Sequence, residues 1–324
     1  MRVDFPKPNI FSSKCLGFAK CRWNGDIIPD KFIAELKPYV NYVTTCPEFE
    51  IGLGIPRDPI RIVFQDELYR LMQLNTERDI TKKMNDFVSG YVTSIKDIDG
   101  FILKDRSPSC GLKDVKVYSS LKPSSSIKRT SGFFAAGVLK SFPNIAVETE
   151  ARLTNFMIRE NFLTKVFTYA KFRKIKNNPL MKNLVQFHAE NKFLLMAYCK
   201  KYLKVLGNIV ANRDKKSLKE VFVEYEVNLL KAMEKAPKFT ATINVLLHAL
   251  GYFSKKLTSD EKRFFLNTLE EYRREQIPLS VPVNLVRSYI IRFDESYLKQ
   301  QTFFEPYPKE LIEAKDSGKK RDYR

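Results

Sequence analysis

Residues 100–111 read GFILKDRSPSCG, an apolar run followed at once by a short loop with proline, glycine and Cys110. The run is typical of a buried strand, and the loop is typical of a tight turn. A cysteine in such a loop is poorly placed to fill a core. The nearby Lys104 and Arg106 favour its thiolate form, which binds metals and attacks electrophiles. The stretch therefore predicts a strand whose end presents a functional thiol.

The first half of the chain contains further strand-like runs, and helical patterns lie between them. Candidate strands at 39–45, 100–105 and 115–120 alternate with helical spacing of apolar residues at 58–73 and 77–98. This alternation predicts an α/β domain, Rossmann-like, with a partly parallel sheet. In such sheets, sites form beyond the carboxyl ends of the strands.

Three stretches place a cysteine beside Gly, Pro or Ser and near a basic residue. They are SSKCLGFAKCRWNGD around Cys15, TTCPEFEIGLGIPRDP around Cys46 and KDRSPSCGLKD around Cys110. Each cysteine follows an apolar or β-like stretch, so we expect all three on loops at one sheet edge. No CxxC pair occurs, which gives a structural zinc site little support. Three converging thiolates suit a soft metal centre with one open position, such as an iron–sulfur cluster bound by three cysteines.

From about residue 155 the pattern changes to helices. Apolar residues recur with helical period, and Thr258 with Glu261 forms a capping box that starts a helix. The expected helical stretches are 155–176, 184–212, 219–236, 258–276 and 283–301. We therefore predict an α/β domain at 1–154 and an all-helical domain at 155–324.

Charge is the strongest compositional signal. The formal net charge is +19, and most of the excess lies in the second half of the 324 residues. A field of this sign attracts polyanions and suits nucleic acid, although a merely basic surface is the alternative. No apolar run approaches the roughly 20 residues that span a bilayer. The first residues lack the apolar core of a secretory signal, and five cysteines are an odd number, so we expect a cytoplasmic protein without a disulfide framework.

The three cysteine stretches, in the order in which they occur along the chain, resemble the motifs of the thiouracil desulfurase family. The resemblance covers about residues 8–154, and stretches of the second half are similar to the helical domain of the family's two-domain members. Those bacterial members are similar to desulfidases that remove sulfur from 4-thiouridine in tRNA, whereas one-domain relatives resemble enzymes for free thiouracil or thiouridine monophosphate. The matching motifs read Cys15-Leu16-Gly17, Arg22-Trp23-Asn24-Gly25, Cys46-Pro47-Glu48, Gly52-Leu53-Gly54-Ile55-Pro56-Arg57 and Ser107-Pro108-Ser109-Cys110-Gly111.

The resemblance implies an iron–sulfur cluster, expected to be 4Fe-4S, with Cys15, Cys46 and Cys110 as its ligands and one open iron. It implies a desulfidase that converts C=S to C=O in thiolated uridine by a non-redox hydrolysis, with tRNA as the partner and neither a membrane nor a stable protein partner. The alternatives are desulfuration of a free thiopyrimidine, a non-catalytic RNA-binding iron–sulfur sensor and a structural zinc module.

Three residues of the motifs are candidate catalytic groups. Glu48, two residues after a ligand, is the candidate acid/base. Ser107 or Ser109 would hydrogen-bond the base or the sulfur. The alternative for Glu48 is a helix-start or salt-bridge carboxylate, and the alternative for the serines is closure of a turn.

Three cations are candidates for binding the substrate. Arg22, Arg57 and Lys104 would anchor the nucleotide phosphate. Arg57 has a structural alternative, in which it pairs with Asp58 or Glu50.

The remaining cysteines and histidines are less specific. Cys21 stands where relatives carry an aliphatic residue, and it is either a fourth ligand or a small buried residue. Cys199 has the spacing of a helix core. His188, with Lys192 on one helix face, would grip a phosphate or lie between helices, and His248 has no nearby ligand set.

Overall fold

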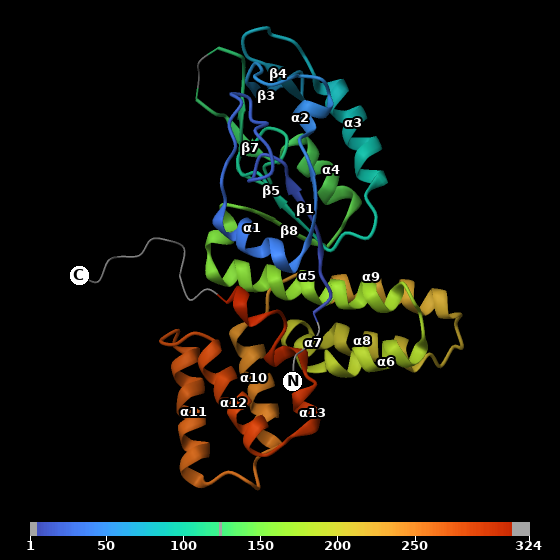
Figure 1. Cartoon of the computed structure of the whole chain (residues 1–324), viewed down its shortest axis with the longest axis vertical. Helices are drawn as coiled ribbons and strands as arrows, with labels where there is room; N and C mark the ends of the chain where they lie inside the picture. The colour runs from blue at the N-terminus through green and yellow to red at the C-terminus, as the bar shows by residue number, and fades with distance from the viewer. Residues whose placement is uncertain (1–4, 123–124, 313–324) are drawn as a thin grey trace, which may run out of the picture. The chain divides into compact units, whose positions relative to one another are not determined.

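The computed structural model describes residues 5–122 and 125–312, which form two compact units (Figure 1). Unit 1 comprises residues 1–171 with 307–324, and unit 2 comprises residues 172–306. The division falls inside helix α5 (Phe156–Lys176), not at the predicted 154/155. Most of α5 belongs with unit 1, where its residue Glu160 also accepts a hydrogen bond from Tyr307 Oη at 3.1 Å.

A parallel sheet forms the centre of unit 1. Its order is β2-β1-β5-β8, and all three pairings are parallel, which confirms the predicted α/β class. Because β2 and β5 flank β1 on opposite sides, the strand order reverses at β1, and α/β sheets bind ligands at such a switch point. The strands are β1 (Asn9–Ser13), β2 (Asn41–Thr45), β5 (Gly100–Leu103) and β8 (Ala146–Thr149).

A second, mixed sheet has the order β4-β3-β6-β7. Here the predicted helix at 58–73 is wrong, because these residues form an antiparallel hairpin. Asp66 and Glu67 at its turn have φ of 51° and 61°, the mirror-image turn geometry that matches strand twist. The strands are β3 (Ile60–Gln65), β4 (Leu68–Gln73), β6 (Val115–Tyr118) and β7 (Lys128–Thr130).

Helices cover the parallel sheet on both faces. On one face, Phe11 and Phe101 of the sheet join Met84, Val88 and Phe134 in one apolar core. On the other face, a Cβ placed on Gly100 would lie only 2.6 Å from Val166 of α5, so glycine permits this close approach. The other helices of this unit are α1 (Lys31–Leu36), α2 (Pro47–Glu50), α3 (Thr81–Ser94) and α4 (Phe133–Ser141), with short 3₁₀ turns η1 (Lys37–Tyr39), η2 (Arg152–Thr154) and η4 (Lys309–Leu311).

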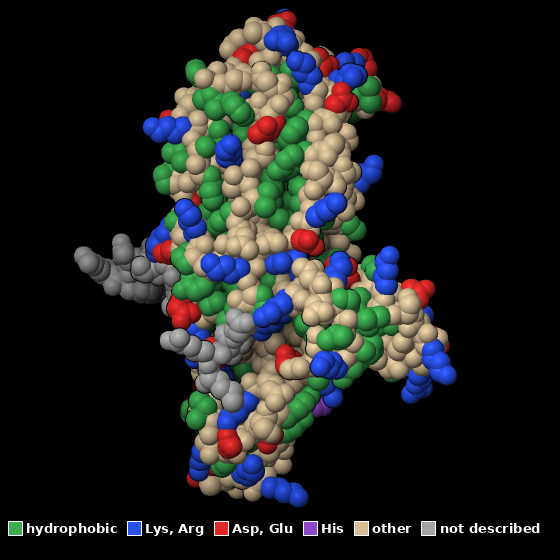
Figure 2. Space-filling view, turned by 45° about the vertical axis from the view of Figure 1, so that its right-hand side comes forward, with side chains coloured by type: hydrophobic (Ala, Val, Ile, Leu, Met, Phe, Trp, Pro, Cys, Tyr) green, Lys and Arg blue, Asp and Glu red, His purple; other side chains and the backbone are tan. Residues whose placement is uncertain are grey.

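Unit 2 is helical, as predicted, and Thr258 caps its helix α11 with the expected capping box. None of the helices in the described ranges combines the length and apolar character needed to cross a bilayer. Figure 2 shows Lys and Arg side chains on the surface of both units, interleaved with hydrophobic ones. The helices are α6 (Met181–Glu190), α7 (Lys192–Tyr198), α8 (Lys200–Ala211), α9 (Leu218–Ala232), α10 (Phe239–Gly251), α11 (Ser259–Arg273), α12 (Ser280–Arg292) and α13 (Ser296–Lys299), followed by η3 (Thr302–Phe304).

The single helix expected at 184–212 is instead three helices. Asn191 and Cys199 separate them, and Cys199 has an extended backbone with φ of −159°. Cys199 therefore lies half-buried between two helices and does not occupy the helix core predicted for it.

His188 lies between helices, which was one of its two predicted roles. Its Nδ1 is 3.1 Å from the Tyr225 hydroxyl, so the contact joins α6 to α9. The ring of Phe172 stacks on Tyr225 with centroids 5.5 Å apart. Burial and the charge of Lys192 lower the pKa of His188 below its ordinary 6.5.

Acid is therefore expected to destabilise unit 2 through His188. Because the folded pKa is depressed, the unfolded chain binds more protons once the pH falls below about 6.5, and stability is lost as the pH falls further. Unfolding by urea at pH 7 and pH 5 measures this loss. His188→Gln should flatten the pH dependence, whereas His248→Gln, at an exposed position on α10, should leave it unchanged. Equal slopes for His188→Gln and the wild type would contradict the assignment.

Candidate active site

The carboxyl ends of the four parallel strands meet at one cavity of unit 1. Cys15 follows β1, Cys46 follows β2, Cys110 lies on the loop after β5, and Glu150 follows β8. All four residues line the same cavity, with a volume of about 460 Å³. The three motif cysteines thus lie at one sheet edge, as their positions after β-like stretches predicted.

The cavity wall combines soft, charged and apolar groups. Four of the chain's five cysteines line it, because Cys21 joins the three predicted ones. Acidic and basic side chains lie beside them, and apolar side chains complete the wall. The lining includes Cys15, Cys21, Cys46, Cys110, Glu48, Arg57, Lys104, Glu150, Ser107, Arg22, Trp23, Pro59 and Ile60.

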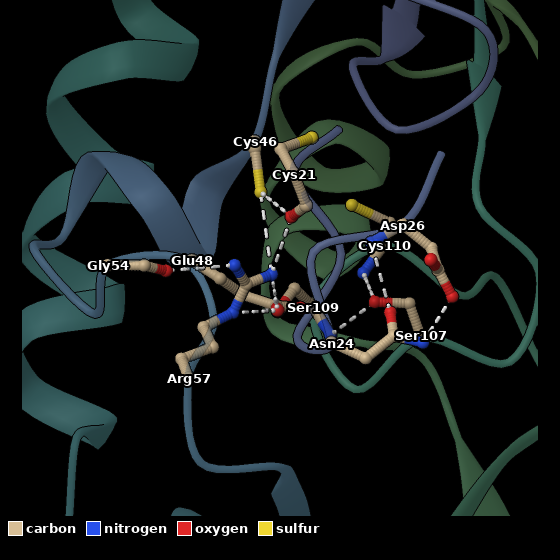
Figure 3. A network of polar contacts seen from close by, with 10 residues as sticks. All are labelled: Cys21, Asn24, Asp26, Cys46, Glu48, Gly54, Arg57, Ser107, Ser109 and Cys110. Carbon is tan, nitrogen blue, oxygen red and sulfur yellow. Dashed lines mark hydrogen bonds and ion pairs between the residues drawn. The ribbon is translucent and has the colours of Figure 1, made fainter. Parts of the chain in front are cut away.

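A buried guanidinium connects Glu48 to the cysteines (Figure 3). Arg57 donates through Nε to Glu48 Oε2 at 2.9 Å, and its Nη2 also pairs with that oxygen. The same Nη2 donates to the Cys21 carbonyl at 3.0 Å and lies 3.7 Å from Cys46 Sγ. The Arg57 side chain is only 3% exposed. This cation therefore holds a carboxylate and a thiol together.

The two predicted serines have different positions. Ser109 is fully buried behind Glu48, and its hydroxyl donates to Glu48 Oε1 at 2.8 Å. Ser107 lines the cavity, and its oxygen accepts from the backbone N–H groups of Ser109 at 3.2 Å and Cys110 at 3.1 Å. Ser107 thus closes the turn that carries Cys110, and within the described ranges no acceptor takes its hydroxyl proton. Ser109 positions the carboxylate, whereas Ser107 faces the cavity.

Helix α4 begins against this loop. The backbone N–H groups of Phe133 and Phe134 donate to the carbonyls of Pro108 and Ser109 at 3.1 Å and 2.9 Å. A Cβ on Gly132 would lie 2.5 Å from the backbone of Ser109, so only glycine permits this approach. The loop with Cys110 is therefore supported by a helix from behind.

Two of the three predicted phosphate anchors are used within the protein. Arg57 pairs with Glu48, not with the Asp58 or Glu50 considered from the sequence, and Asp58 instead accepts from the backbone of Asn75. Lys104 forms an ion pair with Glu150. These contacts give no support to a phosphate-binding role for either cation. Arg22 lines the cavity and is half-buried, so its predicted role stands as a prediction.

Cys21, Cys46 and Cys110 are buried, and their surroundings raise the pKa of each thiol. The hydrogen bond with Cys15 and burial raise the pKa of Cys21 to about 11, against a lowering by the hydrogen bond with Cys46. The hydrogen bond with Cys21 and burial raise the pKa of Cys46 well above its usual range, and burial does the same to the pKa of Cys110. Metal binding at such thiols must displace their protons.

Cys21, for which the sequence left a fourth ligand and a small buried residue as alternatives, is buried and also lines the cavity with Cys15 and Cys46. One residue of the site was not singled out from the sequence. Glu150 directly follows β8, and a strand prediction there would have found it.

Comparison with known proteins identifies this unit. The 2-thiouracil desulfurase family matches residues 10–150. The protein YbbK of Bacillus subtilis is 32% identical over 109 residues, which cover 32% of this chain and 72% of YbbK.

The chain belongs to the 2-thiouracil desulfurase family.

Other matches concern further parts of the chain. A family described as a protein of unknown function (DUF1722) matches residues 192–308, so this desulfurase has the two-domain architecture expected from its sequence. YbgA of Escherichia coli is 24% identical over 161 residues, 49% of this chain and 95% of YbgA. Among solved structures, the [4Fe-4S]-dependent thiouracil desulfidase TudS is 25% identical, with a TM-score of 0.37, over 45% of this chain and 93% of that one.

The donor set of the cavity fits the iron–sulfur cluster expected from the sequence. In residues 5–122 and 125–312, no three His, Cys, Asp or Glu side chains could hold a single metal ion together. The thiols instead surround a larger space, and soft thiolates are the ligands that iron–sulfur clusters use. Arg57 beside Cys46 offsets the charge of a thiolate.

The support of the Cys110 loop by α4 predicts the effect of one methyl group. Gly132→Ala should push the backbone of Ser109 away and displace Cys110, so we expect less iron bound per chain after anaerobic reconstitution. Gly90→Ala is the matched control, because Gly90 is exposed on α3 with nothing within 4 Å of an added Cβ. It should gain about 0.5–1 kcal/mol in stability and bind iron normally. Equal iron content in both variants would show that the close approach does not position the ligand.

Proposed function

We propose that the chain is an iron–sulfur-dependent desulfidase that converts the C=S group of 4-thiouridine in tRNA to C=O. Cys15, Cys46 and Cys110 would hold the cluster. The observation that carries the proposal is the meeting of these three thiols with Glu48 and Ser107 at one cavity. Membership of the 2-thiouracil desulfurase family supports the reaction class.

The overall reaction needs water and no redox partner. A thiocarbonyl compound and water give the carbonyl compound and hydrogen sulfide. When bound, a cluster with one iron free of protein ligands supplies a soft Lewis acid for the substrate's sulfur. The protein then has to bind the base, place a water molecule and move its proton.

Glu48 is the group that would take this proton. Its Oε2 is held by Arg57 and its Oε1 by the Ser109 hydroxyl, so both oxygens are fixed in orientation. Oε1 accepts from the neutral Ser109 hydroxyl while Oε2 carries the contacts with Arg57, so Oε1 is the oxygen that would take the proton from water. Ser107 would donate its free hydroxyl proton to the base. A proton transfer of this kind contributes about 10²–10⁴-fold to a rate.

The choice of RNA as substrate rests on charge. The basic excess of the chain lies mostly in its second half, and phosphate neutralisation drives RNA binding. Lys200, Lys201 and Lys204 are exposed on α8, and within the described part of the chain none of them forms an ion pair. They lie on adjacent turns of one helix and would contact the RNA backbone.

A free thiopyrimidine is the second candidate substrate. The description of the matching family as a 2-thiouracil desulfurase favours it. It needs unit 1 and no RNA contact. The two candidates therefore differ in whether the lysines of α8 affect the rate.

Activity on two substrates separates the candidates. Anaerobically reconstituted protein should remove the thiocarbonyl absorbance of thiolated tRNA, with a rate that falls steeply as salt rises. Replacement of Lys200, Lys201 and Lys204 by alanine should slow the reaction of tRNA and weaken its salt dependence, while the rate on free 4-thiouracil stays the same. Similar losses on both substrates would remove the role of α8 in RNA binding. An intact cluster with no change in either substrate would refute the desulfidase proposal.

The roles of Glu48 and Cys110 predict different defects. Glu48→Gln keeps an oxygen for Arg57 but cannot take a proton, so turnover should fall about 10²–10⁴-fold while iron content stays near that of the wild type. Cys110→Ala should lose both iron and turnover. Cys199→Ala, outside the cavity, is the control and should lose neither. A regulatory, non-catalytic cluster would instead leave RNA-dependent function intact in Glu48→Gln.

A further inference from the structure

Trp23, the only tryptophan in the chain, lies at the wall of the thiol cavity. It is 46% exposed, in contrast to Cys21, Cys46 and Cys110, which line the same cavity and are buried. A single exposed apolar side chain is ordinary on a protein surface. Trp23 differs from such a residue because its ring lines the proposed reaction site and is accessible to a ligand.

The backbone around Trp23 is fixed. The N–H of Gly25 donates to the Arg22 carbonyl at 2.9 Å, and the N–H of Arg22 donates to the Asp26 carbonyl at 3.1 Å. Gly25 has φ of +81°, which favours glycine at this turn. The Trp23 carbonyl accepts from the N–H of Arg57 at 2.7 Å. The aromatic residue is therefore tied to the same arginine that holds Glu48.

The wall around Trp23 is suited to one class of ligand. Pro59 and Ile60 add apolar surface to the lining, while the thiols and Glu48 supply the soft and polar groups. A thiolated pyrimidine presents the matching surfaces, because its ring has a flat π-face and its reactive C=S bond lies at the ring edge. Aromatic side chains commonly stack on such unpaired bases, which are read by polar groups at their edges.

We propose that the indole of Trp23 stacks on the pyrimidine ring of the thiolated base and directs its C=S edge toward the thiols. The inference rests on the proposed function, because it requires a thiolated pyrimidine as the substrate. It adds a binding residue that holds the base by its face, independently of whether the base arrives free or within RNA. In RNA, the base must leave its neighbours in the stack to be held in this way.

Tryptophan fluorescence tests the stacking without turnover. In the full chain all tryptophan emission comes from Trp23, so 4-thiouracil should cause a saturable loss of emission and should protect the ring from acrylamide. The double variant Trp23→Phe with Phe264→Trp is the matched control, because Phe264 is 63% exposed on α11 in unit 2. Its emission should keep the same acrylamide quenching with and without 4-thiouracil. Unchanged acrylamide quenching of wild-type Trp23 at saturating 4-thiouracil would overturn the proposal.

Kinetics of the reconstituted enzyme provide the second test. Trp23→Ala should raise KM for 4-thiouracil about tenfold to a hundredfold, the usual range for loss of one stacking contact, with kcat within a few-fold of the wild type. Trp23→Phe keeps an aromatic face and should stay near the wild-type KM. Phe264→Ala should have no effect on either constant. An equal KM for Trp23→Ala and the wild type would overturn the proposal.

The two tests also separate this inference from the proposed function. Protection of Trp23 by 4-thiouracil in a protein that never removes the sulfur would support the stacking and refute the desulfidase reaction. Desulfidation with no protection and no rise in KM would refute the stacking alone.

Discussion

Parallel pairing of the strands is the constraint on which the site depends. Parallel strands all have their carboxyl ends at the same edge of the sheet. The register Ser13↔Thr45 aligns the last residues of β1 and β2. Cysteines that are far apart in the sequence thereby reach one cavity. The four pairing strands are four or five residues long, so each loop begins at nearly the same height. A one-residue slip would turn the following side chains to the other face of the sheet.

Much of the fold could be predicted because the signals were local. The strand before the Cys110 loop, the helix in 77–98 and the capping box at Thr258 each depend on a few neighbouring residues. The hairpin at 58–73 could not be told from a helix, because its apolar residues fit both periods and its turn, Asp66-Glu67, lacks glycine and asparagine. Tertiary pairing decided between the two.

Some residues of the candidate site could also be predicted from the sequence, whereas the contacts of others depend on the fold. The resemblance to the desulfurase family pointed to the motif cysteines and Glu48, and the structure brings them to one cavity. The partner of Arg57 could not be predicted, because the sequence places three carboxylates near it, Glu48, Glu50 and Asp58, and nearness in the sequence does not select Glu48. Only the fold decides which carboxylate faces the guanidinium. The same holds for Ser109, which differs from Ser107 by two positions yet lies behind Glu48, outside the cavity wall.

The pair of Arg57 and Glu48 ties folding to chemistry. With side chains 3% and 14% exposed, the two charges are largely removed from water. Loss of one partner leaves the other charge uncompensated, at a cost on the order of 3–5 kcal/mol for a buried pair. Glutamine in place of Glu48 still offers Arg57 an oxygen, whereas an apolar residue there would favour replacement of the arginine as well. The two positions are therefore expected to change together. A homologue with apolar residues at both positions would keep the fold but would lack the carboxylate proposed to accept a proton.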